Sequence, residues 1–151
     1  MDVRHETLVF EREFKAPPAR LFQAFRDPRE REIWSAPDTG TEIRIDQTDL
    51  RTGGRETGRC GPRGDLKWTT NVIYHLVADD RLIIFTEELW DGDHLLTVAL
   101  ITFEFAPSGG EGTTLRLTDQ VTSFVGDGGV SGHRQGYTKA LDNLSRSLVP
   151  A

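Results

Sequence analysis

The sequence of 151 residues contains a single cysteine, Cys60, and no long run of apolar residues. One cysteine excludes an internal disulfide framework. A transmembrane helix requires about 18 or more consecutive apolar residues, and the N-terminal segment lacks the apolar core of a signal peptide. These absences predict a cytoplasmic protein with no membrane partner.

Positive charge is also scarce, since 18 Lys and Arg residues stand against 24 Asp and Glu residues and give a formal net charge of −6. Binding to a nucleic-acid backbone requires a concentrated basic face, so no nucleic acid is expected as a partner. A hydrophobic fraction of 36% and a charged fraction of 28% are typical of globular proteins. The length is enough for one domain with its own core, and we expect residues 1–151 to form a single domain.

Motifs for catalysis or metal binding are absent as well. The 4 histidines are far apart, and there is no His-Glu-x-x-His, no cysteine pair and no Gly-x-Ser-x-Gly. Asp91-Gly-Asp-His94 is better explained as a solvated hairpin turn than as a metal loop. The segment 126–132 is better explained as a flexible lid or linker than as a phosphate cradle. We therefore expect no metal and no cofactor, and we interpret Cys60 as a small strand residue.

A clear helical periodicity occurs near the C-terminus. Within residues 134–149, Tyr137, Leu141, Leu144 and Leu148 recur at the spacing i, i+4, i+7, i+11, which places them on one face of a helix. An isolated amphipathic helix of this length is only marginally stable in water. This face is therefore expected to pack on the rest of the chain.

The preceding residues alternate in hydrophobicity and are separated by turn signals, as β-strands are. Leu21, Phe22 and Phe25 indicate one short helix, and Asp27-Pro28-Arg29-Glu30 has the capping pattern of a second that ends near Trp34. The short connections predict antiparallel pairing. Strands are predicted over residues 7–15, 41–47, 54–60, 66–77, 81–90, 95–105 and 113–123.

This order of elements resembles the helix-grip fold of the START and birch-pollen-allergen (SRPBCC) superfamily. The local sequence narrows this resemblance through the segments Phe-Glu-Arg-Glu-Phe-Lys-Ala-Pro-Pro (10–18), Ala-Phe-Arg-Asp-Pro (24–28), Ile33-Trp34, Asp-Leu-Arg-Thr-Gly-Gly (49–54) and the Gly136-Tyr137 helix. These segments are similar to one branch of the superfamily, named after the activator of the heat-shock-protein-90 ATPase. Two departures are a single tryptophan near position 34 and Gly136-Tyr137 where Gly-Trp is common.

The resemblance implies an α+β fold in which a seven-stranded antiparallel sheet curls around the long C-terminal helix. It also implies non-enzymatic binding of a small, largely hydrophobic molecule in a cavity between the sheet and that helix. Two alternatives stay open. One is a cyclase- or aromatase-type enzyme that uses Asp119, Glu88, Tyr74 or His75 as acid or base. The other is a chaperone-partner role, which the name of the branch suggests.

Part of the cavity lining follows from strand register. Pairing Phe105 with Thr113 points one apolar face inward, with Asp119 as its polar exception. Pairing Trp90 with Leu95 turns Trp90 and its alternate neighbours inward, although a slip of one residue reverses them. In the strand 66–77, either Trp68, Val72 and Tyr74 or Asn71, Ile73 and His75 face inward. The expected lining is Trp34, Trp68, Tyr74, Thr86, Glu88, Trp90, Ala99, Ile101, Asp119, Tyr137 and Leu141.

Two further contacts are predicted. Arg12 and Asp119 both fall on the inward face of strands that neighbour one another in the helix-grip order, so we expect an ion pair, directly or through one side chain. Residues 82–85 and 95–101 are apolar on both faces. Strands buried on both sides have this pattern, so the outer face is expected to pack on a second copy in a homodimer.

Overall fold

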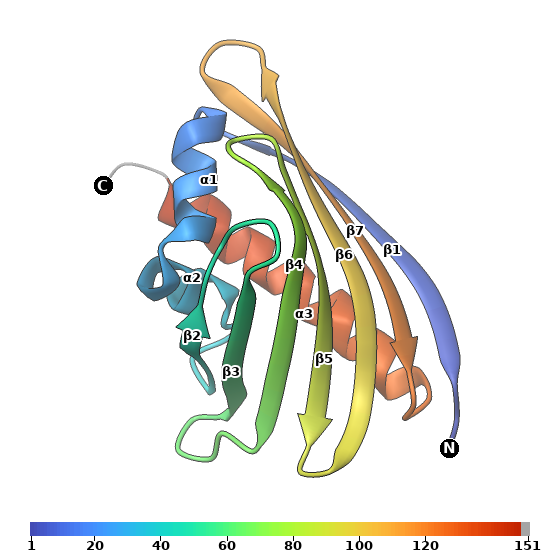
Figure 1. Ribbon diagram of the computed structural model, residues 1–151. Coiled ribbons are helices and arrows are strands. Elements are labelled where there is room, and N and C mark those ends of the chain that lie inside the picture. The colour runs from blue at the N-terminus through green and yellow to red at the C-terminus, as the bar shows by residue number, and fades with distance from the viewer. Residues whose placement is uncertain (149–151) are drawn as a thin grey trace.

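The computed structural model describes residues 1–148, which form an α+β helix-grip fold (Figure 1). The sheet is antiparallel, with strand order β1-β7-β6-β5-β4-β3-β2, and it curves around the long helix α3. Both the predicted element order and the fold class are confirmed. The elements are β1 (Arg4–Phe14), α1 (Pro18–Arg26), α2 (Pro28–Ser35), β2 (Thr41–Thr48), β3 (Arg55–Pro62), β4 (Trp68–Ala78), β5 (Leu82–Asp91), β6 (His94–Ser108), β7 (Gly112–Ser123) and α3 (Asp127–Ser147).

The start of α2 has the predicted N-cap. The Asp27 side chain accepts hydrogen bonds from the backbone N–H groups of Arg29 (2.9 Å) and Glu30 (3.3 Å). These bonds satisfy two amides that the first helical turn leaves without partners. The carboxylate of Glu30 instead binds Arg20 at 2.7 Å, so only the aspartate half of the capping box forms.

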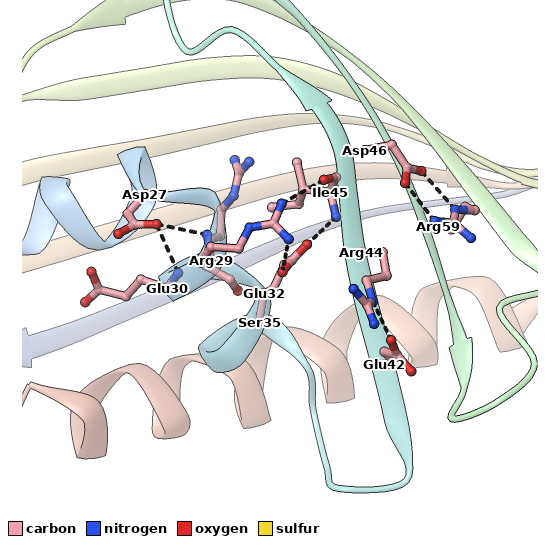
Figure 2. A network of polar contacts seen from close by, with 11 residues as sticks. Asp27, Arg29, Glu30, Glu32, Ser35, Glu42, Arg44, Ile45, Asp46 and Arg59 are labelled. Atoms are coloured by element: carbon pink, nitrogen blue, oxygen red, sulfur yellow. Dashed lines mark hydrogen bonds and ion pairs between the residues drawn. The ribbon is translucent and has the colours of Figure 1, made fainter.

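Helix α2 is fastened to the edge strand β2 by side-chain bonds to the backbone (Figure 2). The Ile45 N–H donates to Oε2 of Glu32 (2.7 Å), and the Arg29 guanidinium donates to the Ile45 carbonyl oxygen (3.1 Å). At this point β2 has a register irregularity, and no further strand pairs with it. The two side chains therefore take the place of a neighbouring strand and hold α2 against the sheet.

The β6–β7 register differs from the predicted one by two residues. Phe105 lies opposite Leu115 and not opposite Thr113, and Ile101 lies opposite Asp119. Because side chains alternate with a period of two, this shift leaves each residue on its predicted face. Ile101 and Asp119 still point inward, and both are fully buried.

The predicted orientation of residues in β5 is wrong. Trp90 does pair with Leu95, but an irregularity between Leu89 and Trp90 places Glu88 opposite Val98. This one-residue shift reverses the faces, as β-bulges do. Thr86, Glu88 and Trp90 therefore lie on the outer face, whereas Phe85, Glu87 and Leu89 line the interior.

In β4, Trp68, Val72 and Tyr74 take the inward positions. The Gly53 N–H donates to the Tyr74 carbonyl oxygen (2.8 Å), and the Tyr74 N–H donates to the Gly54 carbonyl oxygen (2.9 Å). A Cβ on Gly54 would lie 1.9 Å from the Asp49 carbonyl oxygen, so this turn requires glycine. The glycine pair thus fixes the backbone of an interior tyrosine.

Helix α3 begins at Asp127, seven residues before the predicted start, so the interpretation of 126–132 as a lid or linker is wrong. A Cβ on Gly129 would lie 2.2 Å from Oγ of Ser123 at the end of β7. Glycine is therefore required for this close packing of the helix on the sheet. The amphipathic stripe extends as predicted through Leu144, which is fully buried, to Leu148. Residue 149 lies outside the described residues.

The predicted Arg12–Asp119 ion pair is also wrong. Arg12 lies opposite Leu115 and Asp119 opposite Leu8, so the two side chains are four positions apart along the strands, about 13 Å. The Arg12 guanidinium instead binds Asp142 of α3 at 2.6 Å, with both side chains partly exposed.

Packing is dense at the end of the sheet that α1 covers. The ring of Phe25 lies 4.9 Å from Phe103 and 5.2 Å from Phe105, and Phe22 lies 5.5 Å from Phe105, measured between centroids. Toward the start of α3 the interior contains glycines in place of large side chains. A cavity is located there.

Candidate functional site

A cavity of about 490 Å³ lies between the inner face of β2–β6, the end of α2 and the first half of α3. Pockets for small organic molecules commonly have volumes of about 300–1,000 Å³. The walls are mainly apolar. Their aromatic part consists of Phe25, Trp34, Trp68, Tyr74, Phe85, Phe103 and Tyr137.

Part of this volume exists because several of the α3 residues that line the cavity are glycines. Gly136 lies on the same face as His133 and Ala140 at the spacing i, i+3, i+7, and all three line the cavity. A Cβ on Gly136 would meet no atom within 4 Å. Glycine in a helix interior costs about 1 kcal/mol relative to alanine. No steric contact requires glycine at this position, and its structural effect is to leave the cavity open.

A histidine–carboxylate pair forms one polar part of the site. Nδ1 of His133 lies 2.6 Å from Oδ2 of Asp119, and Nε2 lies 3.4 Å from Oγ1 of Thr97. Burial alone lowers the pKa of His133. The hydrogen bond to Asp119 and the charges of Asp119 and Glu87 outweigh burial and leave the pKa above its ordinary value of 6.5. The imidazole is therefore biased toward its protonated form.

Glu87 is the second polar group. It occupies the inward position of β5 between Phe85 and Leu89, opposite Val72 of β4 and Ala99 of β6. Burial, only partly offset by the charge of His133, raises the pKa of its carboxyl to about 7. Within residues 1–148 the carboxyl has no hydrogen-bond or ion-pair partner, and Glu87 lines the cavity. Glu87 is thus free to bind a ligand.

A third polar group joins α2 to β3 and β4. The Arg31 guanidinium binds both the Tyr74 hydroxyl (2.8 Å) and the Glu56 carboxylate. The Tyr74 hydroxyl donates to Oε1 of Glu56 (2.8 Å), and Thr48 donates to the same oxygen (2.7 Å). The side chains of Arg31 and Glu56 are 14% and 12% exposed. The pair is mutually neutralised, and its bonds fix the end of the cavity near α2.

Tyr137 and Cys60 add a hydroxyl and a thiol to the lining of the cavity. The Tyr137 ring lies 6.3 Å from that of His133 and 6.2 Å from that of Phe103, and the hydroxyl has no hydrogen-bond partner among the described residues. Burial raises its pKa well above the ordinary value. Burial and the charge of Glu87 raise the pKa of Cys60 to about 11, so its thiol is neutral and a poor nucleophile.

Four of the residues predicted to line the cavity do so: Trp34, Trp68, Tyr74 and Tyr137. Ala99, Ile101 and Leu141 are buried in the core behind it, and Asp119 contacts it only through His133. Thr86, Glu88 and Trp90 lie on the opposite face of the sheet. That any of these residues binds a ligand stays a prediction.

Sequence reasoning missed Glu87, His133, Arg31 and Glu56. One signal for His133 is present, because it precedes Tyr137 and Leu141 at i, i+4, i+8 and so continues the apolar stripe of α3. Regular pairing of β5 places Glu87 on the outer face, and the irregularity that turns it inward has no signal in the sequence.

Within the described part of the chain, no group of three His, Cys, Asp or Glu side chains is arranged to hold a metal ion. No helix in residues 1–148 has the length and apolarity needed to cross a bilayer.

Comparison with known proteins places these features in a family. Residues 15–148 match the family described as Activator of Hsp90 ATPase homolog 1-like protein. A protein of Rhizobium loti has a similar solved structure, with 29% identity, a TM-score of 0.83 and coverage of 98% of this chain and 100% of that one. A Rhizobium leguminosarum protein has 29% identity and a TM-score of 0.80 over 97% and 96% of the two chains. No curated protein matches the chain significantly.

Proposed function

Since this chain belongs to the Activator of Hsp90 ATPase homolog 1-like family, we propose that it binds a small, largely hydrophobic molecule between the sheet and α3. The observation that carries the proposal is the cavity of about 490 Å³ with aromatic walls and a few polar groups. Two of those groups, the Glu87 carboxyl and the Tyr137 hydroxyl, have no partner among the described residues. A site with apolar walls and a few unpaired polar groups is suited to a ligand with one polar end.

Two measurements test this proposal. Native mass spectrometry of the purified protein is expected to show a co-purifying small molecule. If the cavity is empty, the protein is expected to bind the uncharged dye N-phenyl-1-naphthylamine and to enhance its fluorescence. Gly136→Leu extends a side chain into open space in the cavity and is expected to weaken dye binding at least about tenfold, which corresponds to about 1.4 kcal/mol.

The matched control is Gln135→Leu, which adds the same side chain at the neighbouring, exposed position of α3. It is expected to bind the dye as the wild type does. Equal dye binding by Gly136→Leu and the wild type would show that the dye binds elsewhere and would contradict the proposal.

An enzymatic role is the second candidate, and the Asp119–His133 pair favours it. A carboxylate that orients an imidazole beside a cavity is an arrangement that general acid–base catalysis uses. Of the four residues predicted for this role, Tyr74 and Asp119 are in the interior, whereas Glu88 and His75 lie on the outer face, where His75 contacts Thr86 at 2.9 Å. An Asp119→Asn variant that binds ligand but no longer converts it would favour the enzyme over the binding module.

The name of the family also suggests a chaperone ATPase as partner. The mainly apolar cavity, with two polar groups that have no partner in residues 1–148, favours a small molecule over that alternative.

The homodimer stays a prediction. Ile73, Leu100 and Val9 are 37%, 38% and 52% exposed, which supports an apolar outer face. Light scattering at about 100 μM, above the Kd of most weak dimers, is expected to give the mass of two chains.

A further inference from the structure

Every basic residue that lines the cavity is paired with a carboxylate. The guanidinium of Arg31 binds Glu56, and the imidazole of His133 binds Asp119. The other two, Arg44 and Arg59, bind Glu42 and Asp46. Glu87 is left without a partner in residues 1–148. An ionised Glu87 therefore gives the site a net charge of −1 when His133 is protonated and a more negative one when it is not.

Aromatic rings line the same cavity as this carboxyl. Phe85 precedes Glu87 by two residues on the same face of β5, and its ring lies 5.6 Å from that of Tyr74 and 6.2 Å from that of Phe103. The Tyr137 ring lies 6.2 Å from Phe103 on the other side. Aromatic faces carry partial negative charge and attract cations, most strongly in sites that exclude water. The rings and the carboxyl thus favour the same kind of ligand.

Resting on the proposed function, we propose that the ligand is an apolar amine whose protonated nitrogen binds the carboxylate of Glu87. Its hydrocarbon part packs against Phe85, Phe103 and Tyr137. A buried charge is costly unless it is paired, and an ammonium group would supply the missing pair. A neutral alcohol could hydrogen-bond to Glu87 but would leave its charge uncompensated. A carboxylic acid would place a second negative charge beside Glu87 and Asp119.

Affinity for such an amine is expected to rise from about pH 6 to about pH 8. Glu87, with a pKa of about 7 in the unliganded protein, loses its proton over this range and becomes the anion that the ammonium requires. His133, whose pKa is also raised, loses a positive charge as the pH rises, which acts in the same direction. The other charged or titratable residues that line the cavity are Arg31, Arg44, Glu56, Arg59, Cys60, Tyr74 and Tyr137, and Asp119 lies behind His133. Burial raises the pKa values of Cys60 and both tyrosines, which keeps them neutral.

A series of naphthalene compounds of matched size tests the inference: 2-naphthylethylamine, 2-naphthylethanol and 2-naphthylacetate. Displacement of N-phenyl-1-naphthylamine at about pH 8 is expected to show the amine binding at least about tenfold more tightly than the alcohol, and the acetate most weakly. In Glu87→Gln, the amine is expected to lose this advantage while the alcohol binds as before.

Glu88→Gln is the matched control, because Glu88 is the next residue of β5 and lies on the outer face. It is expected to retain the preference for the amine. Circular dichroism of both variants establishes that they are folded. Retention of the amine preference by Glu87→Gln would overturn the inference.

The outcomes separate this inference from the proposed function. If the dye binds but the amine and the alcohol displace it equally, the amine assignment is wrong and the cavity still binds apolar molecules. Tightest binding by the acetate would likewise overturn the amine assignment and would point to Arg31 or His133 as the anchor. If no dye binds and no small molecule co-purifies, the proposed function itself fails.

Discussion

Nδ1 of His133 lies 2.6 Å from Oδ2 of Asp119, and this contact joins the first half of α3 to β7 across the interior. The Asp119 side chain has no exposed surface, and the His133 side chain is 11% exposed. The other carboxylate oxygen of Asp119, Oδ1, is buried without a partner in residues 1–148. The hydrogen bond to His133 therefore offsets much of the free-energy cost of burying this carboxylate.

Asp119→Asn is expected to lower the free energy of unfolding by about 1–3 kcal/mol, because a neutral amide cannot stabilise a buried imidazolium. In the wild type, the raised pKa of His133 provides stability that is complete below 6.5 and is lost as the pH rises through the folded-state pKa. The variant is expected to lose this dependence. NMR titration of the His133 ring should show a lower pKa than in the wild type.

The control for this variant is Asp142→Asn, which removes the carboxylate of the partly exposed Arg12 pair. Pairs of this kind contribute at most about 1 kcal/mol. Equal destabilisation by the two variants in urea, together with an unchanged His133 titration, would contradict the assigned role of Asp119.

Glu87 makes the protein less stable at alkaline pH. Its pKa is raised from 4.5 to about 7, so the folded state binds a proton more tightly than the unfolded chain does. The resulting loss of stability is absent below 4.5, grows as the pH rises to about 7, and is complete above that value. Because the cavity gives the carboxyl some contact with solvent, we estimate the cost at about 1–2 kcal/mol.

Glu87→Gln is therefore expected to raise the free energy of unfolding by about 1–2 kcal/mol at pH 8 and to leave it unchanged near pH 4. Urea denaturation at several pH values provides the measurement, and Glu88→Gln on the outer face serves as the comparison. If the free energy of unfolding of Glu87→Gln depends on pH as that of the wild type does, the pKa of the Glu87 carboxyl is not raised in the folded protein.

Two glycines of α3 are expected to respond in opposite ways to alanine. Gly136→Ala should raise the melting temperature, with a gain of about 0.5–1 kcal/mol, because alanine favours the helix and the added methyl group meets no atom within 4 Å. Gly129→Ala should lower it, because the new Cβ would lie 2.2 Å from Oγ of Ser123. Thermal unfolding of both variants measures the difference, and destabilisation by Gly136→Ala would mean that the helix is closer to the sheet than described.

The two interior tyrosines provide a further matched pair. The Tyr137 hydroxyl has no partner in residues 1–148, so Tyr137→Phe should change the free energy of unfolding by less than about 0.5 kcal/mol. The same change should weaken the binding of a ligand that hydrogen-bonds to this hydroxyl by about 0.5–1.5 kcal/mol. The Tyr74 hydroxyl is bonded to Arg31 and Glu56. Tyr74→Phe should therefore cost about 1–3 kcal/mol of stability. Calorimetry of unfolding and of ligand binding distinguishes the two, and similar results for both would refute this assignment.

The features that the sequence predicted correctly depend on local rules. The stripe of Leu141 and Leu144 in α3 follows from helical periodicity, and the cap at Asp27 follows from residues within one turn. Even the inward position of Asp119 was predicted from an incorrect pairing, because an error of two residues does not change the face of a strand.

The features that only the tertiary structure decided depend on single-residue irregularities and on contacts between distant segments. The register shift between Leu89 and Trp90 turns Glu87 inward and Glu88 outward, the reverse of the prediction. No residue pattern in β5 indicates this shift. The pairing of Asp119 with His133 brings together groups from β7 and α3. Alternation and periodicity determine which residues face inward within one element. The polar groups that meet there are set by the register and crossing of elements, to which local sequence patterns are insensitive.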